Sequence, residues 1–211
     1  MSSEKRRRYE LKARAESQAQ TRARIVQATM ELHREVGPAR TTVAEIARRA
    51  GVQRLTVYNH FPEEAELIGA CQAHWLGLHP LPDLTAGLAL PDPLQRVRVA
   101  LRALYGWYRE TESMAEKVQR DRGTVAALDH LMQETADAGL AEIADALAAG
   151  FAGGHRSAER QRAVIGLALD FWTWRRLDRE GLDDDTAADV MAEAVAGAGS
   201  PRVRSRTGKI S

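Results

Sequence analysis

A glycine turn between two short amphipathic segments restricts the fold of this chain more than any other feature. The first segment follows Thr42, a residue type that caps helix N-termini, and stops at Gly51, a residue type that ends helices. The second segment runs from Gln53 to His60, and we expect Val57 within it to point inward. Two short helices joined by so tight a turn predict a helix-turn-helix motif.

Flanking segments predict the helices that support this motif. Apolar residues recur at three- and four-residue steps over residues 25–36, where Gly37-Pro38 stops the run. A fourth helix is expected from Pro62, because proline is tolerated in the first turn of a helix. Helical spacing returns after the prolines of residues 79–93, and we expect about nine helices in an all-α chain.

The expected organisation has four parts. Residues 1–18 form a basic N-terminal arm, 19–71 the helix-turn-helix domain, 72–198 a helical regulatory and dimerisation body, and 199–211 a disordered basic tail. Within the body we expect helices to about Glu110, near residues 113–121, from about Thr124, over about 158–180, and over the last apolar stretch.

Charge is divided unevenly along the chain. Residues 1–61 hold 13 Lys and Arg against 6 Asp and Glu, a net charge of +7, whereas residues 62–211 hold 17 against 23, a net charge of −6. A basic head suits attraction to phosphates, and an acidic body disfavours binding elsewhere to the same polyanion. A solvated charged face accounts equally well for a single run such as residues 5–8, so charge alone decides little.

The second short helix has the chemistry of a DNA-reading element. The major groove, about 12 Å wide, admits one α-helix, whose outward side chains then reach base edges. A helical hairpin without a DNA role is the alternative at this spacing.

The motif region resembles the TetR family of bacterial regulators. The resemblance rests on residues 25–28, on Thr41-Thr42-Val43-x-x-Ile46-Ala47-x-x-Ala50-Gly51-Val52 and on Thr56-Val57-Tyr58-x-His60-Phe61, and it covers about residues 19–71. It implies a homodimer that binds a palindromic operator and represses transcription until a small molecule binds. Beyond residue 71 only the helical architecture is similar to the family.

The resemblance also implies roles for single residues. Thr42, Thr56, Tyr58 and His60 match positions that contact the DNA backbone, whereas Arg54, Leu55 and Asn59 match positions that face base edges. Arginine favours guanine, asparagine favours adenine, and leucine can touch a thymine methyl group.

One position departs from the family pattern. Glu64 stands where the family commonly has a Lys or Arg that holds a phosphate. Cations of the arm can compensate by following the DNA backbone or by entering the minor groove. These residues are Arg6, Arg7, Arg8, Lys12 and Arg14.

The helix expected over residues 158–180 is apolar nearly all round. Such a helix must be covered on two sides, which favours a core on one side and a partner subunit on the other, with ordinary core packing as the alternative. Together with the last helix it predicts a four-helix dimer interface. The interface candidates are Ile165, Leu169, Trp172, Val190, Met191 and Ala194.

A site for an unknown small-molecule effector is harder to locate, because pocket-lining side chains resemble core side chains. The candidates are Trp75, Trp107, Tyr108, Met114, Met132 and Trp172, with Arg120, Asp121 and His130 as polar neighbours. No cofactor is expected. No metal site is expected either, because Cys71 and His74 alone offer two ligands.

Other function classes find less support. The sequence lacks a nucleophile elbow, a Walker loop, a dinucleotide turn and a zinc-protease helix, so a helical enzyme is disfavoured. A non-specific architectural DNA-binding protein stays open. One cysteine, the lack of a signal-peptide core and the lack of a long apolar run predict a cytoplasmic chain without a membrane span.

Overall fold

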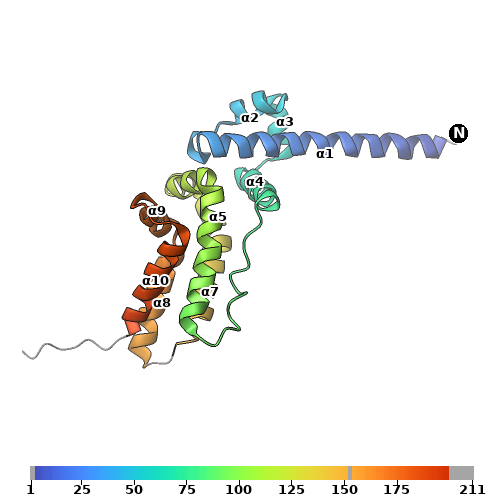
Figure 1. Cartoon of the computed structure of the whole chain (residues 1–211). Helices are drawn as coiled ribbons and strands as arrows, with labels where there is room; N and C mark the ends of the chain where they lie inside the picture. Colours follow the sequence, from blue (N-terminus) through green and yellow to red (C-terminus); the bar gives the residue numbers. More distant parts are fainter. Residues whose placement is uncertain (1–2, 152–153, 200–211) are drawn as a thin grey trace, which may run out of the picture. The chain divides into compact units, whose positions relative to one another are not determined.

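The computed structural model describes residues 3–151 and 154–199, with side chains from Arg7 onward. Helices are the only regular secondary structure in this part of the chain, which confirms the all-α prediction. They are α1 (Ser3–Glu35), α2 (Val43–Ala50), α3 (Arg54–His60), α4 (Glu64–Leu78), α5 (Pro93–Asp121), α6 (Ala126–Met132), α7 (Ala138–Ala148), α8 (His155–Leu169), α9 (Phe171–Arg179) and α10 (Asp184–Gly199) (Figure 1).

Two short elements complete the chain path. The 3-10 turn η1 (Pro38–Arg40) precedes α2, and the π-helical turn η2 (Gln133–Asp137) joins α6 to α7. Because α6, η2 and α7 run on as one helix, the described residues form nine continuous helices besides η1, as expected.

The chain divides into two compact units. The first contains residues 1–81 and 111–135, and the second contains residues 82–110 and 136–211. Helix α5 belongs to both, since the division falls between Glu110 and Thr111. The domain limits expected from the sequence stay a prediction, because compactness does not show which residues act independently.

Three expected helix limits were wrong. The first helix begins at Ser3 rather than near Ile25, so the arm is helical. Helix α4 begins at Glu64, two residues after Pro62. The segments expected on either side of residues 110–113 form one helix, α5, because buried Thr111 and Met114 lie on its inner face.

The helix expected over residues 158–180 is also interrupted. Asp170 adopts an extended conformation, and its carboxylate accepts hydrogen bonds from the backbone N–H groups of Trp172 at 2.8 Å and Thr173 at 3.2 Å. This side chain therefore ends α8 and caps α9. The predicted disordered tail lies outside the described residues except for Gly199.

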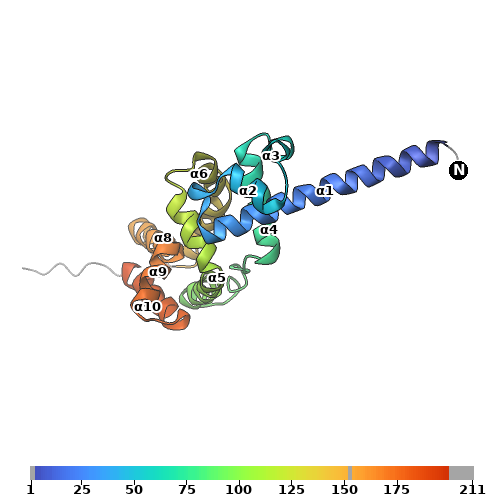
Figure 2. The ribbon, with the colours of Figure 1, turned by 90° about the horizontal axis from the view of Figure 1, so that it is seen from above.

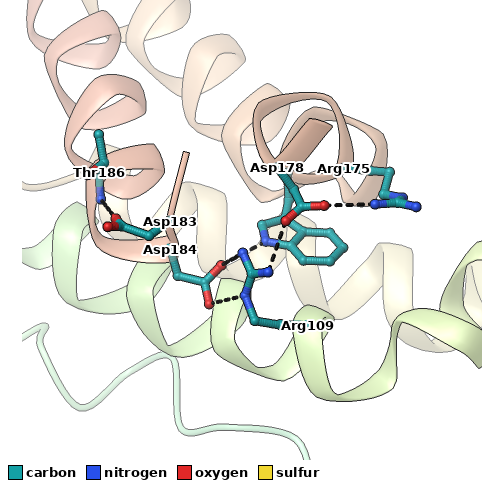
Figure 3. Close-up of polar contacts among 7 residues, drawn as sticks. Arg109, Arg175, Asp178, Asp183, Asp184 and Thr186 are labelled. Carbon is teal, nitrogen blue, oxygen red and sulfur yellow. Dashed lines mark hydrogen bonds and ion pairs between the residues drawn. The ribbon is translucent and has the colours of Figure 1, made fainter. Parts of the chain in front are cut away.

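The second unit has an aromatic core and a row of ion pairs. Tyr108 packs edge-on against Phe171, with ring centroids 5.3 Å apart, and its hydroxyl donates to the carbonyl of Leu169 at 2.8 Å. Figure 3 shows the Arg109 guanidinium of α5 between the carboxylates of Asp184 and Asp178. Its Nε and Nη2 donate to Asp184 at 2.9 and 2.8 Å, and its Nη1 donates to Asp178 at 2.9 Å.

The row continues along the same two helices. Arg102 pairs with Asp185 at 2.9 Å, and Arg98 pairs with Asp189 at 3.0 Å. Three arginines of α5 thus pair with aspartates of α10.

Candidate nucleic-acid interface

The turn between α2 and α3 forms as the sequence predicts. The Thr42 hydroxyl accepts a hydrogen bond from the Glu45 N–H at 3.2 Å and caps α2. Gly51 takes the left-handed conformation, with φ 66° and ψ 40°, and the Val52 N–H then donates to the Ala47 carbonyl at 3.0 Å. This closure sets the direction in which α3 leaves the turn.

Helix α3 separates its side chains into two faces. Val57 and the following Phe61 are buried among apolar residues of α1, α2 and α4. The opposite face exposes Arg54 and Asn59 together with Leu55, which is 65% exposed, and Tyr58, which is 52% exposed. Large apolar and aromatic groups so open to solvent offer contacts to an external surface.

The remaining candidates of this region sit at the edges of α3. Thr56 and His60 are half-buried, whereas Thr42 is exposed at the start of α2. Behind α3 lies a cavity of about 120 Å³, whose lining includes Tyr58, Val57 and His33. Helix α3 is thus supported through Val57 and Phe61, and its polar side chains face outward.

A buried carboxylate holds the loop that leads into α2. Asp121, at the end of α5, accepts the Ala39 N–H at 3.0 Å and a side-chain hydrogen bond from Arg120 at 2.6 Å. Burial raises the pKa of Asp121, but these two hydrogen bonds and the positive charges of Arg120 and Arg40 together outweigh burial and leave the pKa below its usual value. Arg120 also donates to the Val36 carbonyl at 3.1 Å. Asp121 had been expected beside a ligand, and no local sequence signal predicts this pairing across 82 residues.

A buried histidine and the single cysteine lie beneath the same loop. The Cys71 Sγ and the His33 Nδ1 are 3.6 Å apart. Burial lowers the pKa of His33 to about 4, against the opposing charge of Asp121, and burial raises the pKa of the Cys71 thiol to about 12. His74 instead lies 2.8 Å from the Gln27 side-chain oxygen. Among the described residues no cluster of three or more His, Cys, Asp or Glu side chains could hold a metal ion.

Residues 25–71 match the family described as bacterial regulatory proteins of the tetR family. This segment contains the whole helix-turn-helix geometry described above. Over these residues, about a fifth of its length, the chain is similar to the TetR family.

Two sequence relatives are also described as HTH-type transcriptional regulators. HTH-type transcriptional regulator TtgR of Pseudomonas putida is 47% identical over 55 residues, which are 26% of this chain and 26% of that protein. A probable HTH-type transcriptional regulator, ArpR of Pseudomonas putida, matches to the same extent. The chain therefore aligns with about a quarter of the length of these relatives.

Solved structures extend the likeness to the fold of the whole chain. NalD, described as the secondary repressor of the MexAB-OprM multidrug efflux pump in Pseudomonas aeruginosa, is 24% identical with a TM-score of 0.57, over 87% of this chain and 97% of that one. A TetR-like transcriptional regulator from Rhodococcus sp. RHA1 is 19% identical with a TM-score of 0.57, over 85% and 97%. The similarity of fold to these regulators thus extends beyond residues 25–71.

The arm lies along α1. Arg7, Arg8, Lys12 and Arg14 are exposed, and the side chain of Arg6 lies outside the described part of the chain. Figure 1 and Figure 2 both show the N-terminal half of α1 extending past α2–α4. Glu64 is exposed in the first turn of α4. The DNA-backbone role of the arm stays a prediction.

The proposed ligand-binding side chains divide between the two units. Trp75 and Met114 are buried with Met30 and Cys71, Met132 lies beside Gln72, Arg120 pairs with Asp121, and exposed His130 faces Glu134 at 3.3 Å. Trp107, Tyr108 and Trp172 belong to the second unit, where each contacts another aromatic ring. None of the eight lines the cavity behind α3.

The predicted dimer interface needs a correction. Ile165 and Leu169, with exposed fractions of 0% and 1%, are buried within the chain itself. Met191 is buried as well, whereas Val190, Ala194 and Trp172 are exposed. The large apolar side chain that α8 exposes is instead Leu167, which is 57% exposed. Sequence periodicity showed that this helix is apolar nearly all round, but it did not show which side the core covers.

Proposed function

We propose that this protein is a homodimeric transcriptional repressor that binds a palindromic operator through α3. One observation carries the proposal. Within the segment that matches the TetR family, α3 is held by Val57 and Phe61 and exposes Arg54, Leu55 and Asn59. A short, supported helix with such a face suits the major groove.

The exposed groups divide by chemistry into reading and positioning contacts. Arg54 presents donors for guanine O6 and N7, Asn59 pairs with adenine, and Leu55 touches a thymine methyl group. Thr42, Thr56, Tyr58 and His60 contact phosphates, which fix the register of α3 without selecting a sequence.

Dimerisation is supported by the apolar surface of the second unit. Leu167, Trp172 and Val190 are large apolar side chains exposed on α8, α9 and α10, and Ala194 adds a small residue on α10. An exposed apolar face of this kind is best covered by the same face of a second copy around a twofold axis. A twofold dimer presents two copies of α3, which calls for a palindromic operator.

Repression is supported by the names of relatives, since NalD is described as a repressor and TtgR as a transcriptional regulator. The same names favour a non-enzymatic role. Control by a small-molecule effector and a cytoplasmic location stay predictions. None of the described helices is both long and apolar enough to cross a membrane.

Selection of bound duplexes from a random library tests the proposal directly. We expect an enriched palindrome with half-sites about one helical turn apart, or a multiple of that distance. Recovery of unrelated sequences would favour the architectural alternative. Salt titration would then support that alternative if selected and random duplexes gave equal affinities and equal slopes.

A further inference from the structure

Five exposed cations of α1 lie within one half of the circumference of that helix. Arg7 and Arg14 precede Arg22 by fifteen and eight residues, which places them about 60° and about 80° around the helix from Arg22, on the same side. Arg8 precedes Arg22 by fourteen residues, close to four turns, and Lys12 is one turn beyond Arg8. We call these five residues the α1 stripe.

The two acidic residues between Arg7 and Arg22 lie away from the centre of the stripe. Glu10 and Glu16 are each offset from Arg22 by about a third of a turn, in opposite directions. Glu16 forms one pair with Lys12 at 3.8 Å, between side chains that are both largely exposed. Such a pair is worth little in water, so Lys12 can exchange it for a phosphate.

Arg22 joins the α1 stripe to α3. Its guanidinium carbon lies 4.1 Å from the ring centroid of Phe61, the residue directly after α3. Phe61 is buried, and its N–H donates to the Val57 carbonyl at 2.9 Å, so the ring beneath Arg22 is fixed.

Stacking of this kind leaves the guanidinium ready to bind an anion. A guanidinium held over a ring is attracted by the ring face and does not use its N–H donors there, so these donors stay available for an anion. A prepositioned arginine loses less side-chain entropy when it binds a phosphate. Among the described residues Arg22 has no ion pair that would compete.

We propose that the α1 stripe binds the phosphates of duplex DNA that flank the half-site read by α3. The proposal rests on the proposed function, because it places the stripe beside an operator. Two observations favour duplex DNA as the partner. The α1 stripe contains five cations, and one of them, Arg22, contacts Phe61 directly after α3, so the stripe adjoins the reading helix.

The helical form of the arm decides how it meets the DNA. An α-helix with side chains is about 10 Å wide, whereas the minor groove is about 6 Å wide. The arm therefore lies against the backbone and does not enter the minor groove. Its residues 3–20 are about 27 Å long at about 1.5 Å per residue, so the stripe reaches phosphates well outside one half-site.

The test compares full-length variants by salt titration on two duplexes. One is the palindrome recovered by selection, trimmed to its ends, and the other contains the same palindrome with about ten extra base pairs on each side. Arg22→Gln should weaken binding several-fold and reduce the salt slope by about one per subunit on both duplexes. Arg7→Gln with Arg14→Gln should reduce the slope on the long duplex alone.

Arg24 provides the matched control. It is exposed, carries the same charge, and lies about 200° around α1 from Arg22. Arg24→Gln should leave the slope unchanged. Arg22→Lys should retain the slope but bind more weakly, because it keeps the charge and loses the planar stack. Circular dichroism checks that every variant keeps its helix content.

Two outcomes would overturn the proposal. Equal slope changes for Arg22→Gln and Arg24→Gln would show that only net charge matters. Equal effects of the arm variants on trimmed and long duplexes would show that the stripe does not contact flanking DNA. If selection recovers no palindrome, the proposed function fails, and the same slopes on a random duplex of about 40 base pairs still decide whether the α1 stripe binds phosphates.

Discussion

The two units differ in what they leave exposed to solvent. The first buries Val57 and Phe61 and exposes arginines, Asn59 and Tyr58 near the reading helix. The second unit exposes apolar Leu167, Trp172 and Val190, while three arginines of its α5 segment pair with aspartates of the same unit. Exposed cations call for a phosphate partner, and an exposed apolar face calls for an apolar one. The difference supports the proposal that the first unit binds DNA and that the second unit binds a second copy of the chain.

The largest expected effect comes from placing a charge on the buried side of α8, and we compare it with the same change on the exposed side. Leu169→Glu places an unpaired carboxylate in the core of the second unit, so we expect a loss of at least about 3 kcal/mol in the free energy of unfolding. Leu167→Glu changes an exposed residue two positions away, so we expect this variant to fold but to remain a monomer. A monomer has a single helix-turn-helix domain and lacks the second contact with the operator, so its operator affinity should fall by about a hundredfold or more.

Circular dichroism and sedimentation must be measured on both variants, with Trp172→Glu as a second probe of the exposed face. A folded, dimeric Leu167→Glu protein would remove this face from the interface. A folded monomer with full operator affinity would contradict the dimeric mechanism itself.

The sequence predicted the first unit far better than the second. Thr42, Gly51, Val57 and Phe61 act through neighbours a few residues away, so spacing alone identifies the turn and the inward face. The π turn η2, the break at Asp170 and the burial of Ile165 depend on how whole helices pack. Local spacing shows that a helix is apolar on more than one side, but it does not show which side is buried in the core.

Long-range polar contacts were missed for the same reason. Asp121 binds the Ala39 N–H across 82 residues, and Arg109 pairs with Asp184 across 75. Arg22 could have been found as a member of a helical stripe, but its stacking on Phe61 joins residues of two helices. Such contacts appear only when the fold is known.

The second prediction concerns acid stability, and it tests whether the first unit depends on its buried histidine. Burial lowers the pKa of His33 from 6.5 to about 4, so the folded chain excludes a proton that the unfolded chain binds. Stability from this source is complete above pH 6.5 and falls as the pH decreases toward 4, by about 3 kcal/mol in total.

Urea unfolding at pH 7, 6 and 5 measures this loss. His33→Gln should remove most of the pH dependence in that range, whereas His130→Gln, a change at an exposed histidine, should not. Parallel pH profiles for wild type and His33→Gln would refute the assignment.

The third prediction distinguishes reading from positioning on α3. Arg54→Ala should cost about 1–3 kcal/mol on the selected palindrome and relax the preference at one base step per half-site. Tyr58→Ala and His60→Ala should weaken binding to the palindrome and to random duplexes alike, because phosphate contacts lack sequence information. An unchanged base preference in Arg54→Ala would assign readout to another residue, and wild-type affinity of Tyr58→Ala on both duplexes would end its positioning role.

The smallest effect is expected in the ion pairs of the second unit, where Arg109 binds Asp184 with two hydrogen bonds and Asp178 with one. Its side chain is 44% exposed, so water screens part of the attraction, and we expect Arg109→Gln to cost about 1 kcal/mol at low salt. The loss should shrink in about 1 M salt, where the screening length is about 3 Å.

Arg102→Gln is the matched control, because its partner Asp185 is more exposed, and it should cost less. A double-mutant cycle with Asp184→Asn isolates the pair from the hydrogen bond that Trp174 donates to the same carboxylate at 3.1 Å. A coupling energy near zero at low salt would mean that the apolar core alone holds α10 against α5, and the contrast between the two units would then rest on their surfaces.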